Sequence, residues 1–103
     1  MIGKGPKAPA HLSASTKAWW RATVSEWALE LWQLKVLQAA AESWDRAQEA
    51  RSMILAEGAV TRDRFGQAVT HPAVRIERDA RSAFLAAIRV LALDVQAPTT
   101  KGR

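Results

Sequence analysis

Three acidic residues at helical spacing come closest to a catalytic arrangement in this chain. Glu42, Asp45 and Glu49 lie three and four positions apart, so a helix would present them on one face. Paired carboxylates can perform acid–base chemistry or hold Mg²⁺. The same spacing is typical of a solvated helix face with ion pairs between residues i and i+4, such as Glu42 with Arg46. Of these two interpretations we favour the solvated face.

Other residue patterns that support catalysis or metal binding are missing from the sequence. The chain has no Cys, and its two His residues, His11 and His71, stand beside proline regions rather than in a cluster. Without thiolates, two such histidines do not make a convincing zinc site. No glycine-rich loop followed by Lys-Ser or Lys-Thr is present to bind phosphates. We therefore expect a protein that binds rather than an enzyme, with no metal and no cofactor.

Basic residues outnumber acidic ones, 15 to 10, which gives a net charge of +5. This balance favours an anionic partner, nucleic acid first. The cations gather near both ends of the chain and around one turn, whereas the middle is acidic on balance. Ordinary solubilising charge is the alternative, as is protection of a sheet edge for the cations at the turn. The predicted DNA-binding residues are Lys4, Lys7, Lys17, Arg21, Arg62, Arg64, Lys101 and Arg103.

Large apolar residues recur at helical spacing and predict buried or subunit-facing surfaces. The residues expected in the core or in an oligomer interface are Trp20, Trp27, Trp44, Phe84 and Ile88. Two further tryptophans, Trp19 and Trp32, are expected at the rim of these surfaces. There an indole could stack on a base or seal against a neighbouring subunit.

Glycine, proline and capping residues divide the first half of the chain. Residues 1–12 are rich in Gly, Pro and Lys and predict a flexible basic arm. Ser13 is expected to cap a first helix that runs to about Ala28, although no Gly or Pro marks its end. Periodic apolar residues predict a second helix over 31–57, which Gly58 ends.

The second half of the chain begins with a change of pattern. Strand-favouring residues predict a short two-stranded hairpin at about 59–71, with its tip near 64–67. Pro72 suits the first turn of a third helix that runs to about Leu93. Residues 96–103 are expected to form a disordered tail.

The predicted fold class is therefore mainly α, with three helices and a short β-hairpin between the second and the third. The 103 residues amount to one domain, and we expect a single helical domain over 13–95. A core of this size is thin. No apolar run reaches the roughly 20 residues that a membrane-spanning helix needs, so we expect no membrane partner.

Several short segments of this chain together resemble the small-subunit family of tailed-phage terminases, over about residues 6–95. None of the segments is a catalytic motif, and the likeness depends on their order and spacing. The chain departs from the family pattern at 28–30, where a clearer helix break is expected. The segments are Pro6 to Ser13 with Lys17 and Trp20, Ala41 to Arg51, Gly58, Asp63 to Gly66, His71-Pro72, Ile76 to Arg81, and Leu91 to Asp94.

The resemblance implies a function that the spacing of residues alone does not indicate. Terminase small subunits are ring-shaped homo-oligomers that recognise viral double-stranded DNA at its packaging site. They deliver this DNA to the terminase large subunit, which holds the ATPase and nuclease, in the cytoplasm of the infected bacterial host. The family has no short DNA-reading motif to transfer onto this chain. The alternative is a helical protein–protein interaction module with no nucleic-acid role.

Overall fold

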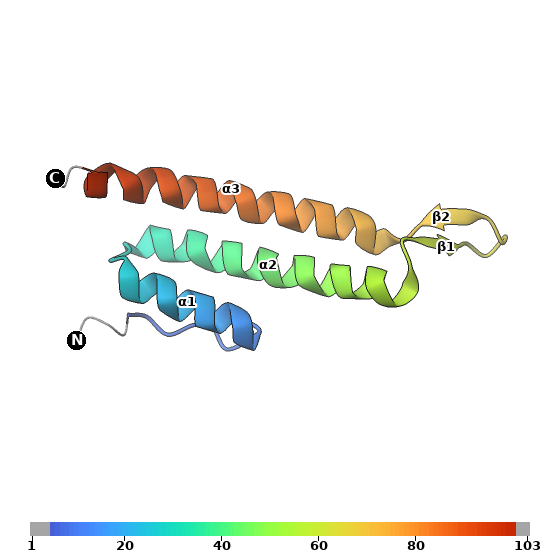
Figure 1. The fold of residues 1–103 in the computed structure, drawn as a ribbon, viewed down its shortest axis with the longest axis horizontal. Helices are drawn as coiled ribbons and strands as arrows, with labels where there is room; N and C mark the ends of the chain where they lie inside the picture. Colours follow the sequence, from blue (N-terminus) through green and yellow to red (C-terminus); the bar gives the residue numbers. More distant parts are fainter. Residues whose placement is uncertain (1–4, 101–103) are drawn as a thin grey trace.

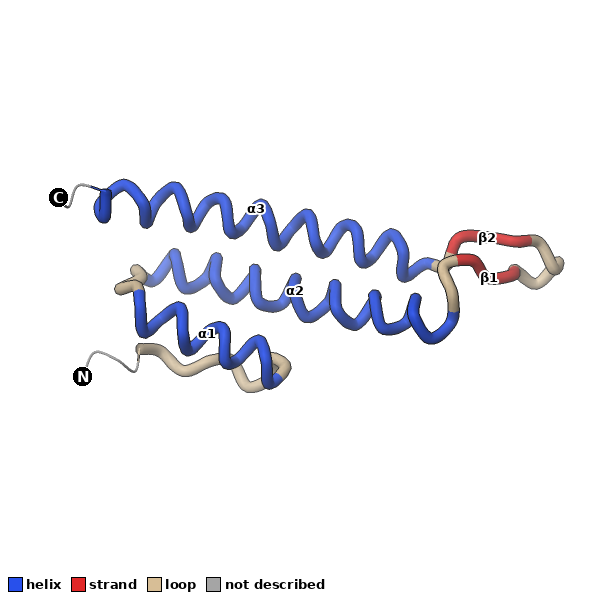
Figure 2. The backbone as a smooth tube through the Cα atoms, in the orientation of Figure 1, coloured by secondary structure: helices blue, strands red, loops and turns tan. Residues whose placement is uncertain are grey.

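The computed structural model describes the backbone of residues 5–100 and the side chains of residues 5–92. The elements are α1 (Ala14–Glu26), α2 (Leu31–Glu57), β1 (Val60–Arg62), β2 (Ala68–Thr70) and α3 (Pro72–Thr100). Figure 1 shows α2 and α3 as long antiparallel neighbours, with α1 folded back along the first half of α2. The two strands project beyond the helices at one end of an elongated molecule of 62 × 26 × 19 Å (Figure 2). The predicted mainly α fold with a hairpin is confirmed.

Small residues allow α2 and α3 to pack closely along their length. The buried residues of this contact include five alanines, each at most 6% exposed: Ala40, Ala47, Ala50, Ala73 and Ala80. Alanine is the strongest helix former and keeps two helix backbones close together. The half of the α2–α3 pair next to the hairpin therefore consists of two helices only, with a thin buried seam.

The larger core residues lie where α1 covers the other half of the pair. Leu37 of α2 is fully buried, and Trp20 and Val24 of α1 pack in the same cluster. The Phe84 ring of α3 contacts Trp44 of α2 at 5.0 Å between centroids and Trp19 of α1 at 6.0 Å. These tilted aromatic contacts join all three helices at one place.

The carboxylate of Asp45 connects the start of α1 to the middle of α2. Ser13 caps α1 as predicted, because its hydroxyl accepts a 3.2 Å hydrogen bond from the backbone N–H of Thr16. The Ser13 backbone N–H donates to Asp45 Oδ2 at 2.8 Å. The hydroxyls of Thr16 and Ser13 donate to Asp45 Oδ1 at 2.6 and 2.9 Å. The helix cap and the contact between the two helices are thus one network.

The break between α1 and α2 lies where the sequence has no stop residue. α1 ends at Glu26, two positions before the expected end, and Trp27 is extended with φ −123° and ψ 134°. The backbone N–H of Glu30, which precedes α2, donates to Gln33 Oε1 at 2.6 Å. This side-chain bond satisfies a donor at the new helix start. Capping and the docking of α1 therefore replace a glycine or proline as the cause of the break.

Residues 5–12, the described part of the segment expected to form a flexible arm over 1–12, pack against α1. Residues 5–12 run back along α1, where Trp20 Nε1 donates to the carbonyl of Pro6 at 2.9 Å. Leu12 is buried in the core cluster, and a Cβ added to Gly5 would lie 2.8 Å from Val24 Cγ2. The indole donor and the apolar contacts hold this segment, so Gly and Pro content here indicates irregular backbone rather than freedom.

The end of α3 also differs from the prediction. The helix continues to Thr100, beyond the expected end at about Leu93 and into the expected disordered tail at 96–103. The helix runs through Pro98, whose φ is close to that of a helix, although its missing N–H removes one hydrogen bond of the helix. Residues 94–97 contain no glycine, so nothing before Pro98 stops the helix.

Replacement of Asp45 by alanine is expected to lower the free energy of unfolding by about 2 kcal/mol, because three hydrogen bonds to a carboxylate are lost. Urea unfolding followed by circular dichroism measures the change. Glu49→Ala is the matched control on the exposed part of the same helix, and it should alter stability by less than about 0.5 kcal/mol. Equal effects of the two substitutions would contradict the assigned role of Asp45.

The effect of Asp45 should also depend on pH. Partial burial raises the pKa of the Asp45 carboxyl. The hydrogen bonds from Thr16 and Ser13 together lower this pKa by a larger amount, so the net shift is downward. A depressed pKa in the folded state contributes stability that is complete above the ordinary aspartate value of about 3.9. This contribution is lost as the pH falls through the lower folded value. The stability difference between wild type and Asp45→Ala should therefore shrink in acid.

Candidate nucleic-acid interface

The hairpin turn is organised by the side chain of Asp63. The strands pair antiparallel in the register Val60↔Thr70 to Arg62↔Ala68, which places the tip at 63–67. Asp63 Oδ1 accepts hydrogen bonds from the backbone N–H groups of Phe65 and Gln67, both at 2.9 Å. Gly66, at φ 79°, provides the left-handed conformation that the turn needs. The tip lies where it was predicted, and it has a defined shape.

Two arginines and one aromatic ring are presented at this tip. Phe65 is 76% exposed, and the guanidinium carbon of Arg64 lies 5.4 Å from the centroid of its ring. Arg62 is exposed, and its Nη1 donates to the carbonyl of Gly66 at 2.7 Å. The two arginines outnumber the single carboxylate of Asp63, so the net charge at the tip is positive.

His71 anchors the base of the hairpin to both long helices. Its backbone N–H donates to the carbonyl of Ala59 at 2.8 Å, and its Nδ1 accepts from the N–H of Ala73 at 3.0 Å. Nδ1 is therefore the unprotonated nitrogen, and Nε2 donates to Glu57 at 2.6 Å. The ring is buried, so this histidine caps α3 and orients the hairpin. Sequence reasoning missed this role, although a histidine directly before the first-turn proline of a helix was a signal for it.

The predicted DNA-binding residues fall into two groups that the fold keeps apart. Arg62 and Arg64 lie on the hairpin, whereas Lys17 and Arg21 lie one turn apart on α1, with Lys7 in the segment beside it. In Figure 1 the hairpin is at one end of the molecule, and α1 covers the part of α2 farther from it. Of the second group, Arg21 and Lys7 are exposed and Lys17 is half-buried. The remaining predicted residues, Lys4, Lys101 and Arg103, lie outside the described residues.

The residues predicted for the core or an oligomer interface differ in how far they are buried. Trp20 is buried inside this chain, and Phe84 and Ile88 are half-buried between the helices. Trp44 and Trp27 remain 38% and 37% exposed. Trp20 thus belongs to the core, and both of these other tryptophans retain surface for contact outside the chain.

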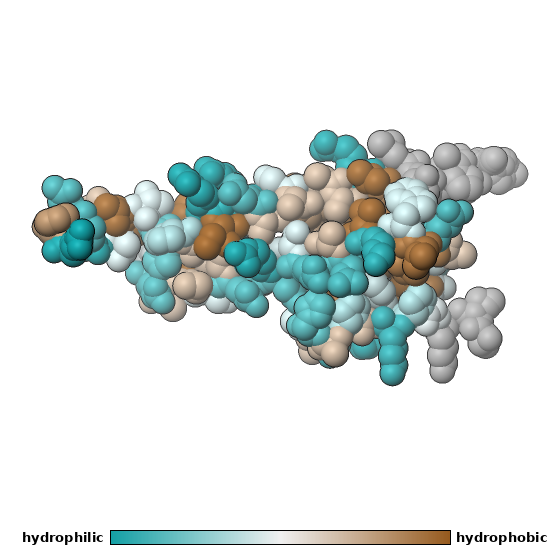
Figure 3. Space-filling view, turned by 180° about the vertical axis from the view of Figure 1, so that it is seen from behind, coloured by the Kyte–Doolittle hydropathy of each residue, from teal (hydrophilic) through white to brown (hydrophobic). Residues whose placement is uncertain are grey.

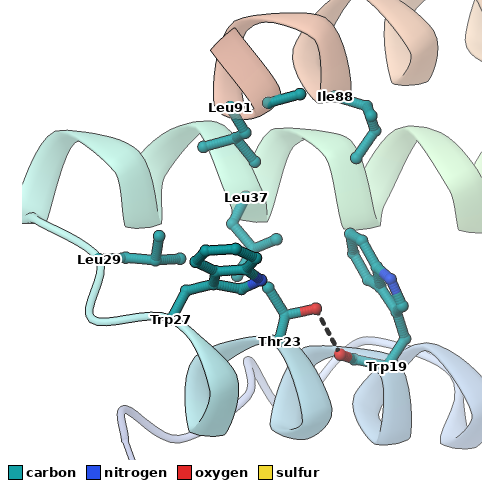
Figure 4. Close-up of a pocket in the computed structure, with 8 residues that line it drawn as sticks. Trp19, Thr23, Trp27, Leu29, Leu37, Ile88 and Leu91 are labelled. Carbon is teal, nitrogen blue, oxygen red and sulfur yellow. Dashed lines mark hydrogen bonds between the residues drawn. The ribbon is translucent and has the colours of Figure 1, made fainter. Parts of the chain in front are cut away.

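An apolar groove of about 340 Å³ opens between the end of α1 and the two long helices. Trp27 and Trp19 of the α1 end lie on its two sides, Leu37 of α2 lies between them, and Ile88 of α3 closes it from the opposite side (Figure 4). Its one hydroxyl, that of Thr23, donates to the carbonyl of Trp19 at 2.9 Å. Leu31 and Trp32, at the start of α2, are 75% and 44% exposed. Figure 3, a view from behind, shows hydrophobic residues at the surface near the end of the molecule away from the hairpin.

Two of the three acidic residues at helical spacing on α2, Glu42 and Asp45, accept hydrogen bonds from other side chains. Hydrogen bonds from Gln38 at 3.0 Å and from His11 at 2.8 Å lower the pKa of Glu42 below its ordinary value. Asp45 accepts hydrogen bonds from Ser13, the cap of α1, and from Thr16, whereas Glu49 is exposed. Glu42 thus pairs with His11 rather than forming the expected ion pair with Arg46. Within the side chains that the structure describes, no three metal-binding groups come together.

Comparisons with protein families, with curated proteins and with solved structures find no match for this chain. Over the part that the structure describes, no helix combines the length and the apolar character needed to cross a membrane. The features of the molecule that bear on its function are therefore the hairpin, the cations of α1 and the exposed apolar residues.

Replacement of Asp63 by alanine is expected to loosen the turn while the helices stay intact, because Phe65 and Gln67 lose their acceptor. Amide hydrogen exchange should become faster at Phe65 and Gln67 and stay unchanged at Leu37 in the core. Asp79→Ala, on the exposed surface of α3, is the control. Unchanged protection of the turn in Asp63→Ala would show that Asp63 does not organise it.

Proposed function

We propose that this chain is a non-catalytic adaptor that binds double-stranded DNA, of the type represented by the small subunit of phage terminases. The observation that carries the proposal is the projecting hairpin, where Arg62 ends β1 and Arg64 lies in an ordered turn. Arginine is well suited to phosphate contact because its charge is permanent and its donors are planar. The net charge of +5 adds a general attraction to a polyanion.

The cations of α1 form a second DNA contact in this proposal. Lys17 and Arg21, one turn apart, bind phosphates together with Lys7, at a distance from the hairpin along the 62 Å length of the molecule. Contacts to phosphates fix the position of a protein on DNA without reading its sequence. Two separated contacts therefore define a direction along the duplex.

Self-association is the second part of the proposal, and exposed apolar residues support it. Trp27, Trp32 and Leu31 cluster along the chain between the end of α1 and the start of α2, and each keeps more than a third of its surface exposed. Exposed tryptophans are frequent anchors of protein interfaces. A homo-oligomeric ring, as the family resemblance implies, would cover them. The terminase large subunit is the second protein partner in this proposal.

The same apolar residues favour the alternative function, a helical protein–protein interaction module without a nucleic-acid role. The two functions differ in what the hairpin arginines do. In the alternative they only protect the edges of a short sheet, and their removal leaves every binding property unchanged.

Substitution of both Arg62 and Arg64 by alanine should weaken binding to a DNA duplex and reduce its salt dependence. Each phosphate contact that is lost lowers the slope of log affinity against log salt by about 0.9. Fluorescence anisotropy with a labelled duplex over a series of salt concentrations gives this slope. Both side chains are exposed, so the fold should not change.

The control for this experiment removes two exposed arginines elsewhere. Arg51 of α2 and Arg89 of α3 are exposed, and their double substitution changes the net charge by the same amount. A loss of slope confined to the hairpin variant supports the proposed site. An equal loss in both variants would mean that net charge alone attracts the DNA. No DNA binding by the wild type would leave the protein interaction module as the function.

Sedimentation of the purified chain at micromolar concentrations should show an assembly larger than a monomer. Trp32→Ala should shift the equilibrium towards smaller species, because a tryptophan anchor contributes about 2 kcal/mol or more to an interface. Met53→Ala is the matched control, since Met53 is 45% exposed against 44% for Trp32. A strictly monomeric wild type would rule out the ring.

A further inference from the structure

Phe65 is the most exposed aromatic side chain among the described residues, and the fold holds it at the tip of a projecting hairpin. A phenylalanine exposed by 76% is costly in water, since its apolar surface contributes nothing to folding. The backbone N–H of Phe65 donates to Asp63 Oδ1, which orders the turn around this residue, and the ring remains exposed to solvent.

Two arginines lie at the same tip as the Phe65 ring. Arg64 lies against Phe65 at 5.4 Å, and Arg62 is braced by its bond to the Gly66 carbonyl. Asp63 is the only acidic residue of the turn. Its carboxylate accepts the backbone N–H groups of Phe65 and Gln67 and not a guanidinium N–H of either arginine. The tip therefore combines one flat apolar ring with two positive charges on a two-stranded ribbon.

We propose that Phe65 is a wedge that inserts between two base pairs of duplex DNA from the minor groove and kinks the duplex. Apolar side chains at protruding tips insert in this way, and the contacts that the bend permits offset the cost of unstacking. Arg62 and Arg64 lie in the groove beside the wedge, where the negative potential attracts guanidinium groups. The inference depends on the proposed DNA-binding function and adds to it the residue and the mode of binding.

The chemistry of the tip favours DNA over a protein partner. A protein pocket for Phe65 would also have to accommodate two adjacent arginines, whereas a nucleic acid provides stacking surfaces next to a row of phosphates. The His71 anchor at the hairpin base joins the hairpin to both long helices, so the whole α2–α3 pair supports the tip when Phe65 inserts.

A wedge implies a sequence preference without any base-specific hydrogen bond. Pyrimidine–purine steps unstack most readily, and A-tracts resist kinking. The chain should therefore bind a duplex with a central TA step more tightly than one with a central A-tract, even though no described side chain has to read a base edge.

The test measures DNA bending by energy transfer between dyes at the two ends of a short duplex with a central TA step. The full-length chain is added to saturation, which anisotropy verifies, so that a weaker affinity is not mistaken for a smaller bend. Wild type should raise the transfer efficiency. Phe65→Ala should abolish this rise and weaken binding roughly tenfold, whereas Phe65→Leu, which retains an apolar wedge, should preserve most of the bend.

Leu55→Ala is the matched control, because Leu55 of α2 is 77% exposed and lies outside the hairpin. It should bend DNA as the wild type does. Binding without bending by the wild type, or equal bending by wild type and Phe65→Ala, would overturn the wedge and leave the proposed function standing. Absence of any binding to the duplex would overturn the proposed function as well. A change in sedimentation of Phe65→Ala with unchanged bending would assign the ring to a protein contact instead.

Discussion

The close packing of α2 against α3 supports every other feature of this molecule. Alanines at the seam, among them Ala47 and Ala80, let the two helices lie side by side over most of their length. One end of the pair carries the hairpin, and the other end provides the surface on which α1 folds. Because the seam is thin, the stability of the chain depends strongly on what covers it at the α1 end.

That cover depends on polar as well as apolar contacts. Asp45 accepts hydrogen bonds from the first residues of α1, while the Phe84 ring contacts Trp19 of α1 and Trp44 of α2. The carboxylate fixes where α1 begins on α2, and the rings fill the space between the three helices. Asp45, one of the three acidic residues at helical spacing on α2, is therefore part of the scaffold.

The functional features lie where the scaffold leaves residues uncovered. The hairpin has its own hydrogen-bonded turn and a histidine anchor, so it can project without a helix beside it. At the opposite end, the break after α1 leaves Trp27 partly exposed beside an apolar groove. In our proposal the hairpin and α1 contact DNA, and the exposed tryptophans mediate assembly.

The sequence by itself determined the helices, the hairpin and the cap at Ser13, because periodic apolar residues, a turn glycine and a local hydroxyl act over a few positions. It also placed Arg62 and Arg64 at a turn. Only the tertiary structure decided that the segment around Pro6 packs on α1, since the bond from Trp20 joins residues distant in the chain. The same holds for the split of the cations into two groups and for the break after Glu26, which packing and side-chain capping determine without a stop residue.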